Sequence, residues 1–213
     1  MEYSALIVAA GSGSRMGLGF NKVYAKLKDG QTILERTIGV FLRDPDCKEI
    51  IVVTDPEEYR KRIPARSIGR IVLCSGGKTR QESVNCGLQA VTQPIVMIHD
   101  GARPYLSLKN LANLKTAMET EKAALLMIPC KDTIKKVVNG YVEETYDRTT
   151  LAAAQTPQVF DTELILDCME RAIKEGFTGT DDTSLVEKYS NVKVKMVEGS
   201  YENIKITTPE DLK

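Results

Sequence analysis

Short apolar runs alternate with longer polar or amphipathic stretches along most of this chain. The apolar runs are rich in Val, Ile and Leu, which is typical of strands buried on both faces of a sheet. They cover residues 4–10, 49–55, 69–76 and 94–100. The stretches between them predict helices over residues 33–44, 56–67 and 79–91, the first with apolar residues at helical spacing. This alternation predicts an α/β fold: a Rossmann-like, mostly parallel central sheet with helices on both faces.

The segment from about residue 129 to residue 160 breaks this alternation. Within it, Asn139 and Gly140 separate two strand-like runs over residues 133–146, which is the strongest short-range signal of a β-hairpin. A hairpin of this length inside an α/β domain has little core of its own. One hypothesis is therefore that residues from about 131 to 150 form a protruding arm that packs on another subunit.

The rest of the chain predicts a helix over residues 161–176, with Gly176 as its C-cap. Strand-like runs follow at residues 192–199 and 202–208, and residues 208–212 resemble the capped start of a helix. The length of 213 residues is that of one domain, so we expect residues 1–213 to form a single domain that carries the arm.

Composition narrows the function classes. Lys and Arg together number 29, as do Asp and Glu, and this zero net charge argues against binding to nucleic acid. The five cysteines are scattered without a C-x-x-C pair, and one histidine leaves no Cys/His metal cluster in the sequence. The N-terminal residues lack the features of a signal peptide, and no apolar run approaches the roughly 20 residues that cross a bilayer. We therefore expect a cytoplasmic protein with reduced thiols and no membrane association.

A glycine-containing loop, "AAGSGSRMG", follows the first predicted strand over residues 9–17. The dinucleotide-binding fingerprint would need glycine where Met16 stands and an acidic residue about 20 positions further on. The second strand ends much later, at Asp55. The P-loop pattern fails too, because Lys22 is not preceded by glycine. Neither familiar nucleotide loop matches.

The loop instead combines glycines with two cations, Arg15 and Lys22. Backbone N–H groups of such a loop can surround a triphosphate while the two cations approach the same phosphates. That combination suits phosphoryl or nucleotidyl transfer, in which negative charge grows at phosphorus. The alternative is a glycine turn that carries two solvated basic residues.

Two further clusters lie at the ends of predicted strands. Residues 76–77 are a Gly-Gly pair before a helix that carries Arg80 and Ser83, and such a loop can approach a base or ribose through its backbone. Asp100 and Arg103 directly follow the strand at 94–100, at the edge where open α/β sheets bind ligands. Asp100 can hold substrate hydroxyls or Mg²⁺, or it can simply form a turn.

Seven segments together resemble one enzyme family. They are "AAGSGSRMG" with Asn21-Lys22, "GGKTRQESV", "HDGARP", "PCKDTIK", "DRTTLAAAQTPQVF", "GTDDTSLVE" and "VEGSYENIKITTPEDL". The chain is similar, from about residue 5 to residue 212, to the 2-C-methyl-D-erythritol 4-phosphate cytidylyltransferases of non-mevalonate isoprenoid biosynthesis. The resemblance implies transfer of CMP from CTP to methylerythritol 4-phosphate, with release of pyrophosphate and with Mg²⁺. It also implies a homodimer whose hairpin arms cross over.

The resemblance also implies roles for individual residues. Arg15 and Lys22 would stabilise the transition state, while Arg148 and Lys205 would position the attacking phosphate. The implied CTP-binding residues are Ala9, Ala10, Gly11, Ser12, Gly13, Gly76, Gly77, Ser83 and Asp100. The implied substrate-binding residues are Asp100, Arg103, Thr133, Arg148 and Thr180, of which Thr133 and Arg148 would serve the partner's site. No metal ligand is assigned to the protein, since Mg²⁺ would bind the phosphates of CTP.

Two alternatives stay open at this point. A ribitol-5-phosphate cytidylyltransferase would use the same chemistry, but its relatives tend to read "AGG" in the loop and to lack "TDDTSLVE". A non-catalytic nucleotidyltransferase-like sensor domain is the second alternative. Such a domain would have no need to keep the cations Arg15, Lys22, Arg148 and Lys205 together.

Overall fold

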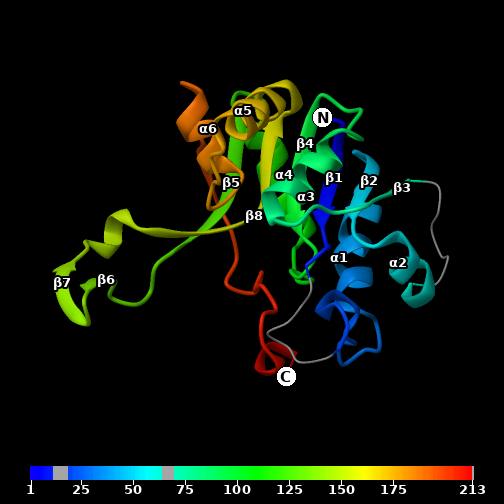
Figure 1. The fold of residues 1–213 in the computed structure, drawn as a ribbon, viewed down its shortest axis with the longest axis horizontal. Helices are drawn as coiled ribbons and strands as arrows, with labels where there is room; N and C mark the ends of the chain where they lie inside the picture. Colours follow the sequence, from blue (N-terminus) through cyan, green and yellow to red (C-terminus); the bar gives the residue numbers. More distant parts are fainter. Residues whose placement is uncertain (12–18, 64–69, 213) are drawn as a thin grey trace.

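The computed structural model describes residues 1–11, 19–63 and 70–212 of the chain (Figure 1). Its main sheet has the strand order β3-β2-β1-β4-β8-β5-β9. The strands are β1 (Tyr3–Val8), β2 (Cys47–Val53), β3 (Ile71–Cys74), β4 (Ile95–Asp100), β5 (Ala123–Pro129), β8 (Ala152–Asp161) and β9 (Lys195–Glu198). Neighbouring strands run parallel except for β8, which is antiparallel to both β4 and β5. The predicted mostly parallel sheet is confirmed.

Helices cover both faces of this sheet, as predicted. They are α1 (Ile33–Leu42), α2 (Pro56–Arg62), α3 (Arg80–Leu88), α4 (Leu108–Ala117), α5 (Thr162–Glu175) and α6 (Thr183–Tyr189). Side chains alternate between the faces: Ile7 of β1 packs with α1 and α4, whereas Leu6 packs with α3, α5 and α6. The two apolar layers fix the strand ends, and therefore the loops that follow those ends.

Local signals define the helix ends. Thr32 and Glu35 form a capping box at the start of α1, in which each side chain bonds the backbone N–H of the other residue. Asp161 caps the start of α5, and Gly176 ends that helix at φ 65°, in the left-handed region that favours glycine. The predicted C-cap at Gly176 is confirmed.

The predicted hairpin consists of β6 (Lys135–Val138) and β7 (Tyr141–Thr145), which pair with each other and not with the main sheet. Asn139 and Gly140 both have positive φ, 51° and 85°, as the tight turn requires. The hairpin extends away from the body of the molecule (Figure 1). Its apolar side chains stay uncovered by this chain, and Tyr141 is 80% exposed. Exposed apolar strand pairs of this kind often mark interaction surfaces.

Several predicted elements differ in the structure. Residues 202–208 form a loop rather than a strand, because the N–H groups of Asn203 and Ile204 bond carbonyls two or three residues back and Ile206 N–H bonds the Ala102 carbonyl. The strand predicted at 192–199 is limited to β9, and residues 208–212 contain a single 3-10 turn, η4 (Pro209–Leu212). The helix predicted at 56–67 ends at Arg62, and residues 64–69 lie outside the described part.

Strand β8 was not predicted, although it lies between β4 and β5 in the sheet. Three alanines and an internal proline weaken its strand signal, since proline removes a ladder donor. Its pairing with β5 joins residues 152–154 and 158–160 and omits residues 155–157 between them. The Thr156–Pro157 peptide bond is cis. The side chains of this interrupted stretch organise the neighbouring loops.

Candidate functional site

A cleft of about 500 Å³ opens at the carboxyl ends of β1 and β4. This is the edge at which open α/β sheets bind ligands. The lining residues come from the end of β1, the 3-10 segment η2 (Lys22–Tyr24), the start of α3 and two later loops. They are Val8, Ala9, Ala10, Gly11, Asn21, Lys22, Val23, Gly77, Lys78, Thr79, Arg80, Ser83, Asp100, Ala102 and Lys205.

The end of β1 brings part of the predicted triphosphate loop to this cleft. Ala9 N–H bonds the Val53 carbonyl of β2 at 2.8 Å, which continues the strand into the loop. The Asn21 side chain donates to the Ala9 carbonyl at 2.5 Å and accepts from the backbone N–H of Val23. Asn21 thereby ties η2 to the end of β1 and places Lys22 on the cleft wall. The predicted residues Ser12, Gly13 and Arg15 lie outside the described residues.

The Gly-Gly loop packs too closely for larger residues. A Cβ at Gly76 would lie 2.3 Å from the Ala10 Cβ, and one at Gly77 would lie 2.4 Å from the Glu82 Cβ. Ser83 Oγ accepts the Gly77 N–H at 3.1 Å, so this serine shapes the loop from within α3. Gly77 and Ser83 line the cleft, whereas Gly76 lines an adjoining hollow beside Ala10.

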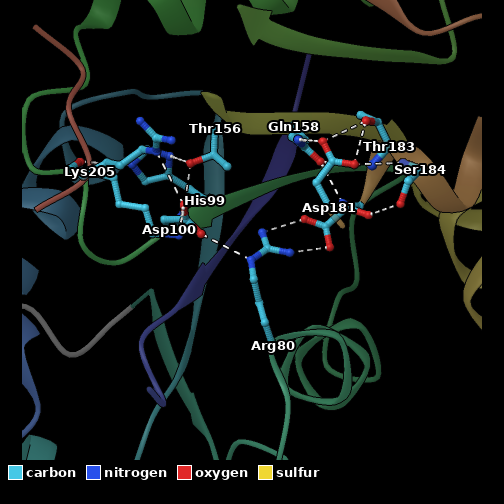
Figure 2. A network of polar contacts seen from close by, with 11 residues as sticks. Arg80, His99, Asp100, Thr156, Gln158, Asp181, Thr183, Ser184 and Lys205 are labelled. Atoms are coloured by element: carbon cyan, nitrogen blue, oxygen red, sulfur yellow. Dashed lines mark hydrogen bonds and ion pairs between the residues drawn. The ribbon is translucent and has the colours of Figure 1, made fainter. Parts of the chain in front are cut away.

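Asp100, at the end of β4, is the charged centre of the cleft. Its Oδ1 accepts from Arg80 Nε at 3.3 Å, and its Oδ2 contacts Lys205 Nζ at 2.9 Å and Arg103 Nε at 3.4 Å (Figure 2). Burial acts to raise the pKa of Asp100, but the three cations outweigh it and hold that pKa well below its usual range. Asp100 is therefore ionised, and the structure brings together the predicted residues Asp100, Arg103 and Lys205.

Arg80 connects Asp100 to a second carboxylate that sequence reasoning did not assign to the site. Its Nη1 and Nη2 donate to the two oxygens of Asp182 at 2.9 and 2.7 Å, a bidentate pair. The Asp182 side chain is 2% exposed. Burial acts to lower the pKa of Arg80, but the carboxylates of Asp182 and Asp100 outweigh it and raise that pKa above its ordinary value. Arg80 follows the predicted Gly-Gly loop in the sequence, and this position could have indicated that it belongs to the site.

Thr156 and His99 hold the backbone behind Asp100. The Arg103 carbonyl can only accept, so His99 Nε2 donates to it, at 3.1 Å, and the unprotonated Nδ1 accepts from Thr156 Oγ1 at 2.9 Å. Thr156 Oγ1 in turn accepts the backbone N–H of Asp100 at 3.0 Å. Burial lowers the pKa of His99 to about 4, so its imidazole is neutral at physiological pH. His99 is therefore a structural hydrogen-bonding residue.

Two glutamines of β8 hold the loops on either side. Gln155 donates to the Ser200 carbonyl at 2.8 Å, and Asn203, within reach of Gln155, donates to the Thr156 carbonyl at 2.9 Å. This fixes the loop that carries Lys205. Gln158 Oε1 accepts the backbone N–H groups of Asp182 and Thr183, each at 3.0 Å, and so fixes the turn that carries Asp182. The short "QTPQ" element thus positions three parts of the cleft.

Three predicted substrate-binding residues lie elsewhere in this chain. Thr133 and Arg148 are exposed on the arm and its base, and Arg148 Nη1 donates to the Lys131 carbonyl at 2.8 Å. Thr180 is exposed in the turn that precedes α6. None of the three lines the cleft as the described residues form it. Their roles toward substrate stay predictions.

Comparison with known proteins identifies the chain's relatives. The sequence model described as "IspD: 2-C-methyl-D-erythritol 4-phosphate cytidylyltransferase" matches residues 3–213. The chain belongs to this IspD family. A 2-C-methyl-D-erythritol 4-phosphate cytidylyltransferase of Geobacillus kaustophilus is 44% identical, over 100% of this chain and 94% of the relative. The relative of the same name from Clostridioides difficile is 45% identical, over 99% and 90% respectively.

Solved structures of IspD proteins share the fold. The crystal structure of 4-diphosphocytidyl-2C-methyl-D-erythritol synthase from Anaerococcus prevotii superposes with a TM-score of 0.88 at 35% identity, covering 99% of this chain and 94% of that one. The 2-C-methyl-D-erythritol 4-phosphate cytidylyltransferase of Thermus thermophilus has a TM-score of 0.83 at 33% identity, covering 100% and 96%. None of the helices among the described residues is long and apolar enough to span a membrane.

The buried histidine gives a testable pH dependence. His99 has a pKa of about 4 in the folded chain against 6.5 when solvated. The unfolded chain therefore binds more protons between these two values, and the free energy of unfolding falls as the pH drops through that window. The full loss is about 3 kcal/mol. Because the chain has one histidine, NMR titration of tag-free protein reports on it alone. An imidazole that titrates near pH 6.5 in the folded protein would contradict this account.

Proposed function

We propose that this chain transfers CMP from CTP to 2-C-methyl-D-erythritol 4-phosphate and releases pyrophosphate, as the names of its IspD relatives indicate. The observation that carries the proposal is the cleft at the sheet edge, where glycine-lined backbone, Lys22 and Lys205 meet around the ionised Asp100. Backbone N–H groups and separated cations suit a polyanionic nucleotide and a phosphate-bearing acceptor.

The chemistry explains why the cleft needs cations rather than a general base. The nucleophile is the phosphate of methylerythritol 4-phosphate, whose second pKa of about 6 leaves it largely dianionic at neutral pH. One of its oxygens forms a bond to the α-phosphorus of CTP while the bond from that phosphorus to the β-phosphate oxygen breaks. Pyrophosphate then leaves with the bonding electron pair. His99 is neutral and engaged on both ring nitrogens, so it is not the base of this reaction.

The proposed roles of the cations follow from where they lie. Lys22 reaches the cleft from the loop side and would neutralise the phosphates of CTP. Lys205, whose side chain is 38% exposed, lines the same cleft beside Asp100 and would bind the attacking phosphate. Arg15 shares the loop of Lys22 and is proposed to act with it. Preorganised cations of this kind stabilise charge that develops in the transition state, and loss of one costs roughly 3–4 kcal/mol.

Mg²⁺ is proposed to enter with the nucleotide. Among the described residues, no group of three or more His, Cys, Asp or Glu side chains is arranged to hold a metal ion. Asp100, the carboxylate of the cleft, is already paired with three cations. These residues therefore fit a Mg²⁺ that is held mainly by triphosphate oxygens. When bound, the ion would neutralise phosphate charge.

The arm supports a homodimer. Its uncovered apolar side chains mark an interaction surface, and Arg148 and Thr133 lie on it rather than in this chain's cleft. We infer that two subunits exchange arms, so that Arg148 of one subunit grips the substrate phosphate in the site of the other. A guanidinium suits this role because it binds phosphate bidentately. The free cysteines fit a reducing cytoplasm.

An assay of pyrophosphate release with two acceptors tests the substrate. With CTP and Mg²⁺, methylerythritol 4-phosphate should support turnover, whereas ribitol 5-phosphate should support little. Faster release of pyrophosphate with ribitol 5-phosphate would show that the chain is a ribitol-5-phosphate cytidylyltransferase instead. No release with either acceptor, while CTP still binds, would favour the sensor domain instead.

Mixed dimers test the arm exchange. Lys22→Ala and Arg148→Ala homodimers should each be nearly inactive. A purified heterodimer of the two should recover up to half of the wild-type kcat, because one of its sites then combines Lys22 with the arm's Arg148 from the other subunit. If Lys22 and Arg148 act in the site of their own subunit, both sites carry a defect and the heterodimer stays inactive.

A further inference from the structure

Asp100 has more cationic partners than its charge requires. Arg80 approaches Oδ1, while Arg103 and Lys205 share Oδ2. Two of the three cations are also held elsewhere: Arg80 by both oxygens of Asp182, and Arg103 Nη1 by the Asn203 carbonyl at 2.7 Å. Within the part of the chain that the structure describes, the Lys205 ammonium contacts Asp100 alone. The three cations are therefore not equally free to leave.

We propose that Asp182 is a positioning residue: it locks Arg80 onto Asp100, and this allows Lys205 to leave Asp100 and bind the phosphate of the acceptor substrate. The proposal rests on the function given above and assigns different roles to the three cations. Arg80 and Arg103 stay with Asp100, and Lys205 is the transferable charge. Figure 2 shows Arg80 and Lys205 on opposite sides of Asp100.

Arg80 is held too firmly to serve as the phosphate ligand. Its bidentate bonds to Asp182 and its bond to Asp100 use three of its five N–H groups in one fixed fork. The Asp182 side chain is 2% exposed, so departure of Arg80 would leave a buried carboxylate without its cation. An uncompensated buried charge is strongly destabilising.

Lys205 is suited to leave. Its side chain is the most exposed of the three, at 38% against 32% for Arg80 and 12% for Arg103. An ammonium on a flexible stem can turn between two anions without the loss of a fork geometry. Asp100 keeps Arg80 and Arg103 after the exchange, so its carboxylate stays compensated.

The turn that carries Asp182 has supports that do not depend on its carboxylate. Gln158 accepts the backbone N–H of Asp182, and Gln81 of α3 joins the same turn by donating to the Phe177 carbonyl and accepting from Gly179 N–H, both at 2.9 Å. Loss of the charge at residue 182 should therefore leave the backbone in place. The carboxylate itself orients Arg80.

The variant Asp182→Asn tests this role. The amide offers one acceptor oxygen and turns a donor toward the guanidinium, so the fork is lost and Arg80 can leave Asp100. Asp100 then keeps only Arg103 and Lys205, so the departure of Lys205 would leave its charge less compensated. We expect the KM for methylerythritol 4-phosphate to rise at least fivefold while the KM for CTP changes less than twofold. Steady-state kinetics with each substrate varied in turn measures both values, with the melting temperature recorded for each variant.

Asp44→Asn is the matched control. Asp44 is also a buried carboxylate, 3% exposed and paired with Lys115 at 3.0 Å, but it lies outside the cleft and bonds Tyr3 at the start of β1. The variant Asp44→Asn should lower the melting temperature and leave both KM values within twofold of the wild-type values.

A second variant, Arg80→Lys, keeps the charge but lacks the two-pronged guanidinium, so it should have the same effect as Asp182→Asn. The double variant should be no worse than the worse single one, because both remove the same lock.

Three outcomes would overturn the proposal. They are an unchanged KM for methylerythritol 4-phosphate in Asp182→Asn, an equal rise of both KM values, and fully additive effects in the double variant. If Asp182→Asn does not fold, Arg80→Lys carries the test with the same criteria. A wild-type protein that is inactive with methylerythritol 4-phosphate would instead overturn the proposed function, and the two failures are therefore distinguishable.

Discussion

A buried carboxylate at the end of the central strand β4 is the interaction on which the cleft depends. Asp100 is 6% exposed and ionised, and water cannot compensate its charge at that depth. The fold supplies one cation from the turn that follows β4, Arg103, and two from other segments, Arg80 of α3 and Lys205 of a loop near the C-terminus. The same contacts that neutralise Asp100 gather positive charge at the mouth of the cleft. One of these cations, Lys205, is also the proposed ligand of the acceptor phosphate, so its contact with Asp100 links the stability of the cleft to substrate binding.

Strand β8 holds these segments in their relative positions. Its antiparallel insertion between β4 and β5 interrupts the parallel sheet, and the unpaired stretch at residues 155–157 turns its polar groups to the neighbouring loops. Gln155 fixes the loop of Lys205, Thr156 fixes the backbone of Asp100, and Gln158 fixes the turn of Asp182. One short segment thus sets the relative positions of both carboxylates and of the transferable lysine.

The sequence predicted the features that local signals encode. Strands β1 to β4, the Asn139-Gly140 hairpin and the placement of Asp100 at a strand end all follow from patterns within a few residues. Strand β8 was not predicted because its alanines and Pro157 weaken the strand signal. The Arg80–Asp182 pair was not predicted because it joins residues 102 positions apart, and a local sequence pattern carries no information about such a distant contact. The alternation of residues 202–208 predicted a strand, yet their backbone N–H groups bond within the loop or, at Ile206, the Ala102 carbonyl rather than a neighbouring strand.

The cations around Asp100 thus divide into two fixed arginines and one transferable lysine. A crystal structure of the protein with bound methylerythritol 4-phosphate would show which cation moves. We expect Lys205 Nζ within hydrogen-bond distance of the phosphate, with Arg80 still bidentate on Asp182 and still against Asp100. A phosphate bound by Arg80 with its bonds to Asp182 broken, while Lys205 remains on Asp100, would contradict this division.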